Sequence, residues 1–359
     1  MKWVDVLKGI LARPVVAGQR IVPILWGLPG VGKTARVKEI ARELGAHLEV
    51  VILSIRDATE VAGLPMKAQD GSIKIAPSSW AMRAAEAARK GRRVVVFFDE
   101  LTTVPRAVQA AALRILLEGV VGELELPESV AFVAAANPPD VAAGGWDLEP
   151  PMANRLLHLH VKPDVEEWVR WAQGQGPTFA LVAAFVRRRP DLLLDFPKER
   201  SRRGEAWPSP RSWAALAAAM EALGTRDPDD LVEVAHGAVG PGAASEFLTW
   251  LEQVDLPEPA EVLERPHEIP LPAREDAVFA LTLGAVHLAG KRGTAEAVEA
   301  VAAFLARVYR AGYADIAAAG GSELVPAVKE LLNRGELRDI PAFYGELSPE
   351  LLTAFAALK

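Results

Sequence analysis

The sequence predicts an α/β fold in which a five-stranded, mostly parallel sheet lies between layers of helices and is followed by a region built of helices alone. Three observations lead to this prediction. Over the first 160 residues, short apolar runs alternate with helical patterns, which is typical of a parallel sheet whose strands are joined by helices. Strand-like runs stop after Pro163. From there on, patterns rich in alanine and leucine recur at helical spacing.

The five expected strands are short and almost entirely apolar, as are parallel strands that are covered on both faces. They are residues 21–26, 48–53, 93–98, 130–136 and 156–161. The clearest helical patterns of the second half are residues 212–224, 275–290 and 295–309. Between the first two of these helices, the proline-rich residues 255–272 predict a linker.

The composition excludes several classes of protein. At 359 residues the chain is longer than one hydrophobic core usually serves, so two or three domains are expected. The absence of cysteine excludes disulfides, thiolate metal sites and cysteine nucleophiles. A net charge of −7 argues against a surface dedicated to duplex DNA. The apolar stretch at the start is too short for a signal peptide, and no later run approaches the length of a membrane span, so a soluble cytoplasmic protein is expected.

A glycine-rich stretch after the first expected strand has the composition of a phosphate-binding loop. Gly27, Gly32, Lys33 and Thr34 fit the pattern G-x-x-x-x-G-K-[ST], in which backbone amides surround phosphates, the lysine reaches the outer ones and the hydroxyl binds Mg²⁺. The loop opens a helical pattern that ends near Gly45, so free amides and the helix dipole would point at the anion. The residues expected to contact the nucleotide here are Gly27, Leu28, Pro29, Gly30, Val31, Gly32, Lys33, Thr34 and Ala35.

Two acids, Asp99 and Glu100, close the third expected strand. A carboxylate at the end of such a strand can lie near the phosphate loop and hold Mg²⁺ through water, and we assign this role to Asp99. Asp99 and Thr34 are therefore the expected metal site. Glu100 follows at a position where it could activate the attacking water as general base.

Asn137 ends the fourth expected strand, before Pro138 and Pro139 stop it. Ligands of parallel sheets bind outside the carboxyl ends of the strands, so Asn137 can face the same crevice as Lys33 and Glu100. There it would orient the water or contact the γ-phosphate. Its alternative role is to cap an Asn-Pro turn.

Two arginines occupy defined positions downstream and could stabilise the charge that builds up during phosphoryl transfer. Arg155 lies just before the fifth expected strand. Arg211 lies in the first turn of a helix that Ser209 and Pro210 are expected to open. Judged by their chemistry alone, arginines of this kind are more often surface ion-pair partners.

The order of these segments resembles that of the AAA+ ATPases, and within them the MoxR-type group, over residues from about 20 to 250. The resemblance implies a P-loop NTPase αβα sandwich followed by a helical lid. It identifies the glycine loop and the acidic pair as Walker A and Walker B, and Asn137 as sensor 1. Arg155 would be the arginine finger that reaches a neighbour's nucleotide, and Arg211 would be sensor 2 from the lid. The sequence around Arg155 departs from the acid-Arg-Phe pattern often found there, and Arg114 is the alternative finger.

Two further segments suit the MoxR-type group. The helix expected after the second strand is interrupted between Arg56 and Trp80, where Asp70 and Gly71 predict a tight hairpin. In that group an insert in this helix lies toward the ring pore. Residues 119–129 are expected to form a second short hairpin before sensor 1.

The resemblance, taken with the proline-rich linker and the helical patterns after it, predicts a nucleotide-binding domain at residues 1–161, a helical lid at 162–254, and a linker with a further helical domain at 255–359. The last hundred residues match no pattern of the family. The resemblance implies ATP and Mg²⁺ as cofactors and hydrolysis of ATP to ADP and phosphate. It also implies assembly into a ring, expected to be a hexamer, that remodels a protein partner with a von Willebrand factor A-like domain. ATP is preferred to GTP because the chain has no Asn-Lys-x-Asp guanine motif.

Other hypotheses stay open on the same fold. A nucleic-acid motor or translocase is disfavoured by the acidic net charge. The basic runs at 187–190 and 198–205 are expected to be solvated loops, with phosphate or nucleic-acid contact as the alternative. A slow nucleotide-dependent switch or scaffold is opposed by Glu100. A small-molecule kinase would not need Arg155 and Arg211 around a water-activating glutamate.

Overall fold

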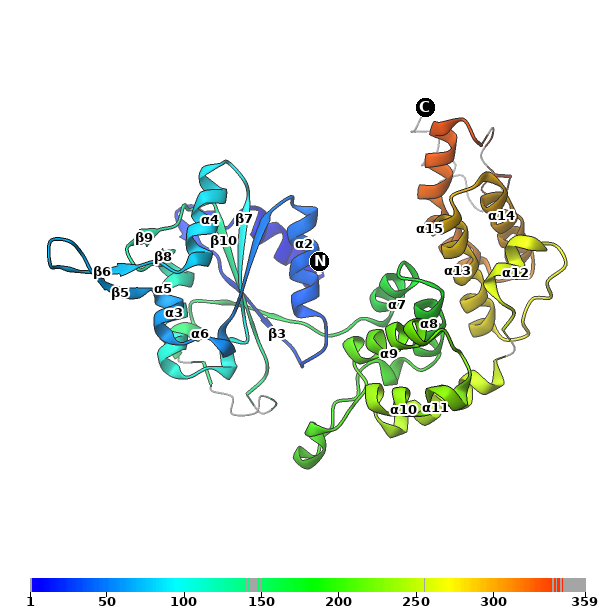
Figure 1. Cartoon of the computed structure of the whole chain (residues 1–359), viewed down its shortest axis with the longest axis horizontal. Coiled ribbons are helices and arrows are strands. Elements are labelled where there is room, and N and C mark those ends of the chain that lie inside the picture. Colours follow the sequence, from blue (N-terminus) through cyan, green and yellow to red (C-terminus); the bar gives the residue numbers. More distant parts are fainter. Residues whose placement is uncertain are drawn as a thin grey trace. The chain divides into compact units, whose positions relative to one another are not determined.

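The computed structural model describes residues 2–139, 141, 147, 148, 150–254, 256–337, 339, 341, 342 and 344 of the chain. The chain divides into two compact units, Met1–Lys162 and Pro163–Lys359 (Figure 1). The division into three domains remains a prediction. Asp255, where the third of them was expected to begin, and residues 345–359 near its end lie outside the described residues.

The first unit contains a central sheet, small two-stranded hairpins and the helices around them. The strands of its central sheet are β3 (Pro23–Trp26), β4 (His47–Ile52), β7 (Val94–Asp99), β10 (Val130–Ala136) and β11 (Leu157–His160). The strands of its hairpins are β1 (Val15–Val16), β2 (Gln19–Arg20), β5 (Leu64–Lys67), β6 (Ile73–Ala76), β8 (Val120–Val121) and β9 (Leu124–Glu125). Its helices are α1 (Trp3–Ala12), α2 (Lys33–Glu43), α3 (Ala58–Ala62), α4 (Ser79–Arg89), α5 (Arg106–Glu118) and α6 (Pro150–Ala153).

The central sheet confirms the predicted fold. Its strands lie in the order β4-β7-β10-β3-β11, and every neighbouring pair is parallel. Helices α3, α4 and α5 share a hydrophobic cluster with one face, while α1 contacts β10 and α2 contacts β4 and β7. Because helices cover both faces, residues 94–98 of β7 and 130–136 of β10 are buried side by side. Each expected strand agrees with an observed one to within two residues at either end.

Both predicted hairpins are present. β5 and β6 pair antiparallel on either side of Asp70 and Gly71, and the glycine has the positive φ of 85° that a turn of this kind requires. This hairpin separates α3 from α4 and projects away from the sheet (Figure 1). β8 and β9 form the second hairpin, and the Glu123 N–H donates to the Ile75 carbonyl at 3.1 Å. The two hairpins are therefore joined through their backbones.

The second unit is helical, and its helices from α7 to α15 contribute to one hydrophobic cluster. They are α7 (Val165–Gln173), α8 (Pro177–Arg188), α9 (Pro210–Leu223), α10 (Pro228–Val239), α11 (Pro241–Gln253), α12 (Pro259–Glu264), α13 (Glu275–Arg292), α14 (Ala295–Arg310) and α15 (Ala314–Arg334). The predicted helices at 212–224, 275–290 and 295–309 correspond to α9, α13 and α14. Within residues 255–272, α12 contributes the fully buried Val262 to the shared cluster.

The basic run at 187–190 differs from the solvated loop that we expected. Arg187 and Arg188 end α8, and Arg187 pairs with Asp315 at 2.6 Å. Arg189 pairs with Asp191 at 2.9 Å and with Glu246. These arginines bond to acids up to 128 residues away, which a local pattern does not reveal.

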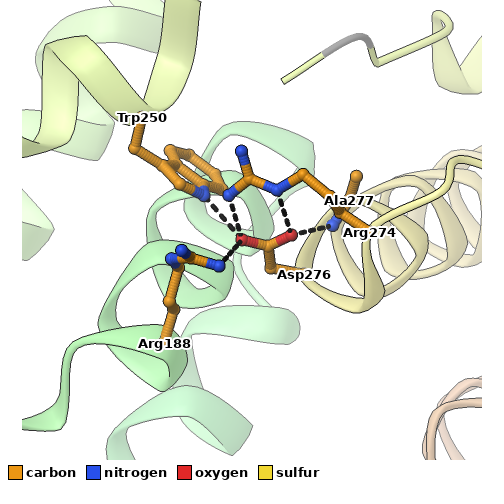
Figure 2. A network of polar contacts seen from close by, with 5 residues as sticks. All are labelled: Arg188, Trp250, Arg274, Asp276 and Ala277. Atoms are coloured by element: carbon orange, nitrogen blue, oxygen red, sulfur yellow. Dashed lines mark hydrogen bonds and ion pairs between the residues drawn. The ribbon is translucent and has the colours of Figure 1, made fainter. Parts of the chain in front are cut away.

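Asp276 is the centre of a polar network that joins α8, α11 and α13 (Figure 2). Its carboxylate, only 9% exposed, accepts hydrogen bonds from Trp250 Nε1 at 2.7 Å, Arg274 Nε at 3.0 Å and Arg188 at 3.4 Å. Burial by itself raises the pKa of Asp276, but the hydrogen bonds from Arg274, Trp250 and the Ala277 N–H, together with the charge of Arg274, outweigh it, so the pKa lies below its ordinary value.

In the part of the chain that the structure describes, no helix combines the length and the apolar character needed to cross a membrane.

Candidate functional site

The glycine loop runs from the end of β3 to the first turn of α2. Gly30 and Gly32 have φ values of 80° and 93°, which residues with a side chain rarely adopt. Gly32 is the N-cap of α2 and, having no side chain, offers no oxygen to the amides of the first turn. These amides are therefore left for a ligand, and the positive end of the helix dipole favours an anion.

Gly27 allows the base of the loop to approach β11 closely. A Cβ atom at this position would lie 2.8 Å from the Val161 carbonyl oxygen and 3.1 Å from Val31 Cγ2. The Gly27 N–H also donates to the Ala136 carbonyl at 3.3 Å. The loop is thus tied to the ends of the two strands that flank β3.

Lys33 is the first residue of α2, directly after the loop, and only 8% of the residue is exposed. Its ammonium group donates to the Gly27 carbonyl at 2.7 Å, the Leu28 carbonyl at 3.1 Å and Asn137 Oδ1 at 2.8 Å. In each of these three bonds the acceptor of the buried cation is a neutral oxygen. Phosphate oxygens, which are charged, would be stronger acceptors for the same donors.

Thr34 and Asp99 meet at the start of α2 and the end of β7. The Thr34 hydroxyl donates to Asp99 Oδ2 at 2.6 Å, and Asp99 Oδ1 accepts from the Glu100 N–H at 2.9 Å. A hydroxyl beside a carboxylate is a donor set that Mg²⁺ accepts, with phosphate and water oxygens as its other ligands. Among the described residues there is no cluster of three or more acidic, histidine or cysteine side chains placed to hold a metal.

Glu100 adopts the left-handed conformation, with φ 64° and ψ 38°. This conformation is strained for a residue with a side chain, and such strain clusters at functional sites. The Thr103 hydroxyl donates to the Glu100 carbonyl at 2.8 Å and stabilises the turn. No described residue forms a hydrogen bond or ion pair with the half-buried Glu100 carboxylate, which leaves it available to a water molecule.

Asn137 follows the last residue of β10 and is the residue that joins Lys33 to the acidic turn. Its side-chain oxygen bonds Lys33, and its backbone bonds the Thr102 hydroxyl in both directions. Thr102 and Thr103 were not among the predicted site residues. The only sequence signal for them is a pair of hydroxyl residues shortly after the acids.

Of the three predicted arginines, Arg155 and Arg114 belong to the first unit, and neither forms a hydrogen bond or ion pair with the described residues around the glycine loop. Arg155 follows α6 and is exposed, with no hydrogen bond or ion pair from its side chain to the described residues. Arg114, the alternative finger, bonds Glu118 one helical turn away at 3.1 Å. Arg211 is exposed in the first turn of α9, after the predicted N-cap Ser209 and Pro210. Because Arg211 belongs to the second unit, its role near the phosphates stays a prediction.

Residues 23–152 match the sequence model of the family described as ATPase family associated with various cellular activities (AAA). No curated protein matches the chain. Among solved structures, the chain is similar to a point mutant of RuvB from Thermotoga maritima, with 16% sequence identity and a TM-score of 0.38. That match covers 74% of this chain and 75% of the RuvB chain. The family match and the order of the central sheet together show an AAA ATPase domain at residues 23–152 of the first unit.

Proposed function

We propose that this chain, through the AAA ATPase domain at residues 23–152, is a Mg²⁺-dependent ATPase that remodels a protein partner as a MoxR-type ring. The observation that carries the proposal is the convergence of groups from adjoining strand ends. Lys33 bonds Asn137 at 2.8 Å and Thr34 bonds Asp99 at 2.6 Å. Glu100 lies next to Asp99, with a carboxylate that engages no described residue.

Each side chain has a separate task in hydrolysis. The amides of the loop and the Lys33 ammonium bind and orient the phosphates of ATP. Thr34 and Asp99 would hold Mg²⁺, which neutralises phosphate charge when it is bound. Glu100 accepts a proton from the attacking water as general base. Asn137, beside Lys33, orients that water or the γ-phosphate.

Assembly into a ring, with six subunits as the expected number, is supported by the exposure of Arg155. A solvated arginine without a partner in the described part of its own chain is available to the nucleotide of a neighbouring subunit. An arginine supplied in trans contributes about 10³ to 10⁵ in rate in other nucleotide hydrolases. Turnover would therefore depend on assembly of the ring. Arg211, which belongs to the second unit, would contribute as sensor 2.

A protein partner is supported by the β5–β6 hairpin. Leu64 and Met66 lie on one face of it and are 56% and 54% exposed, while Ile73 lies on the other face and is 74% exposed. Exposed apolar side chains on a projecting hairpin suit contact with another protein. A groove of about 430 Å³ is lined by residues of both hairpins, including Met66, Ile75 and Leu124. The MoxR resemblance adds that the partner carries a von Willebrand factor A-like domain.

The rival hypothesis of a nucleic-acid motor receives less support. Arg187, Arg188 and Arg189 form ion pairs with acids of their own unit, so this basic run is largely neutralised. The run at 198–205 is mostly exposed and contains the 3₁₀ turn Arg200–Gly204. It is the remaining candidate for phosphate contact.

The test is phosphate release from ATP by the purified chain, measured with Mg²⁺ and again after chelation with EDTA. We expect turnover that requires Mg²⁺. Light scattering of Glu100→Gln with and without Mg·ATP then tests assembly, because this variant should bind ATP without hydrolysing it. A ring-sized particle is expected, and a monomer that still binds ATP would contradict a trans-acting arginine. Salt-sensitive stimulation of turnover by DNA would favour the rival hypothesis.

A further inference from the structure

We infer that Thr102 is a positioning residue for ATP hydrolysis, because its hydroxyl fixes Asn137 relative to Glu100. The inference rests on the proposed function. It starts from the contacts of one fully buried side chain, which is 0% exposed in the 3₁₀ turn Leu101–Thr103. The Thr102 hydroxyl donates to the Asn137 carbonyl at 2.9 Å and accepts from the Asn137 N–H at 3.2 Å.

These two bonds satisfy both backbone polar groups of Asn137 where the ladder of β10 has ended at Ala136. The next two residues, Pro138 and Pro139, have no N–H to donate. Asn137 is half-buried, and leaving backbone groups unpaired where water reaches them poorly is costly. A single hydroxyl on the neighbouring segment therefore sets the path of the chain at Asn137.

The other threonine of this turn, Thr103, fixes the backbone of Glu100. The Thr103 hydroxyl and N–H both bond the Glu100 carbonyl, at 2.8 and 3.1 Å. Thr102 thus holds the backbone N–H and carbonyl of Asn137, and Thr103 holds the backbone carbonyl of Glu100. Since Asn137 in turn bonds Lys33 at 2.8 Å, the general base and the phosphate-binding lysine are connected through Thr102.

A buried threonine can also serve only to fill space, and the two roles predict different kinetics. If Thr102 only fills space, losing the hydroxyl changes stability and leaves turnover per folded molecule unchanged. If it positions Asn137, losing the hydroxyl lowers kcat while ATP affinity stays close to that of the wild type. This split is expected because the loop amides and Lys33, which bind the phosphates, stay in place.

The experiment compares Thr102→Ser with Thr102→Ala, two variants that differ by one oxygen atom. Steady-state turnover and the Kd for ATP are measured for both and for the wild type. We expect the serine variant to keep a kcat near that of the wild type. We expect the alanine variant to lose about 10²-fold in kcat, the scale for a misplacement of about 1 Å, with a Kd changed less than about threefold. Thr102→Val, which keeps the volume, should behave like alanine if it folds.

Thr282→Val is the matched control. Thr282 is also 0% exposed, and its hydroxyl has no hydrogen-bond partner among the described residues. Its loss should leave kcat unchanged. Equal kcat values for the Thr102 serine and alanine variants would overturn the inference while leaving the proposed function intact. A wild-type chain without ATP turnover would overturn both.

Discussion

The side-chain oxygen of Asn137 lies 2.8 Å from the ammonium nitrogen of Lys33, so a strand end and a loop 104 residues apart share one buried hydrogen bond. The bond links the residue that would bind phosphate to the residue that would sense it. Lys33 would serve ATP binding and Asn137 would serve turnover, so the two residues should respond differently to substitution.

Lys33→Ala removes the cation of the loop, and we expect ATP affinity to fall about 10- to 100-fold. This range corresponds to one or two hydrogen bonds from a charged group. Fluorescence titration with a labelled ATP analogue measures it. Lys38→Ala is the matched control, because Lys38 is exposed on the same helix. An unchanged affinity in Lys33→Ala would contradict the proposed binding mode.

Asn137→Ala should retain ATP binding and lose turnover. The loop amides and Lys33 remain, so we expect the Kd to change less than about threefold, while kcat falls about 10²-fold for loss of a positioned polar group. Binding titration and phosphate release on the same preparation check both values. If both parameters kept their wild-type values, Asn137 would be only a turn cap.

Gly27→Ala should destabilise the first unit, because the new methyl group meets a backbone oxygen at 2.8 Å, which cannot readily move aside. We expect a loss of about 1–3 kcal/mol in the free energy of unfolding, together with weaker ATP binding. Gly9→Ala is the control. Gly9 lies in α1 with no atom near its missing Cβ, so alanine should stabilise the helix by up to about 1 kcal/mol. Denaturant unfolding of both variants would reveal the difference in sign.

Asp276→Asn should lower stability at pH 7 and have little effect in acid. The hydrogen bonds of Asp276 lower its pKa in the folded state, so its contribution is present above the ordinary pKa of about 3.9 and is lost as the pH falls through the folded value. We expect a loss of about 1.5–3 kcal/mol at pH 7, the scale of a hydrogen bond to a charged group.

Thermal unfolding of Asp276→Asn between pH 3 and 7 measures this dependence, with the exposed Asp195→Asn as control. The gap in Tm between Asp276→Asn and the wild type should close below about pH 4. A gap that stayed constant over this range would show that the charge of Asp276 does not stabilise the fold.

Local sequence patterns predicted the fold and the places of the glycine loop and the acidic turn, because each of these features leaves a trace in neighbouring residues. Residues 94–98 and 130–136 form continuous apolar runs, as strands covered on both faces must. The glycine loop is likewise a local pattern, fixed by the positive φ values at Gly30 and Gly32. The hairpin at Asp70 and Gly71 follows from the chemistry of the turn.

Contacts between distant segments could not be predicted in this way. The bond from Thr102 to Asn137 depends on β7 and β10 being neighbours, and the sheet order is not written in either strand alone. The pairing of Arg188 with Asp276 joins residues 88 positions apart, so a basic run on a helix end was mistaken for a solvated loop. Thr102 was missed, and the basic run at Arg188 was wrongly predicted, because both depend on polar contacts between segments far apart in the chain.

The central claim is that Glu100 activates water next to a bound nucleotide, and the Glu100→Gln variant tests it most directly. Glutamine keeps the size of the side chain and tolerates the same strained backbone, so only the basic carboxylate is lost. ATP affinity and single-turnover hydrolysis are measured side by side with the wild type. The account predicts an unchanged affinity and a rate lower by about 10² to 10⁴. Hydrolysis at the wild-type rate in Glu100→Gln would contradict it.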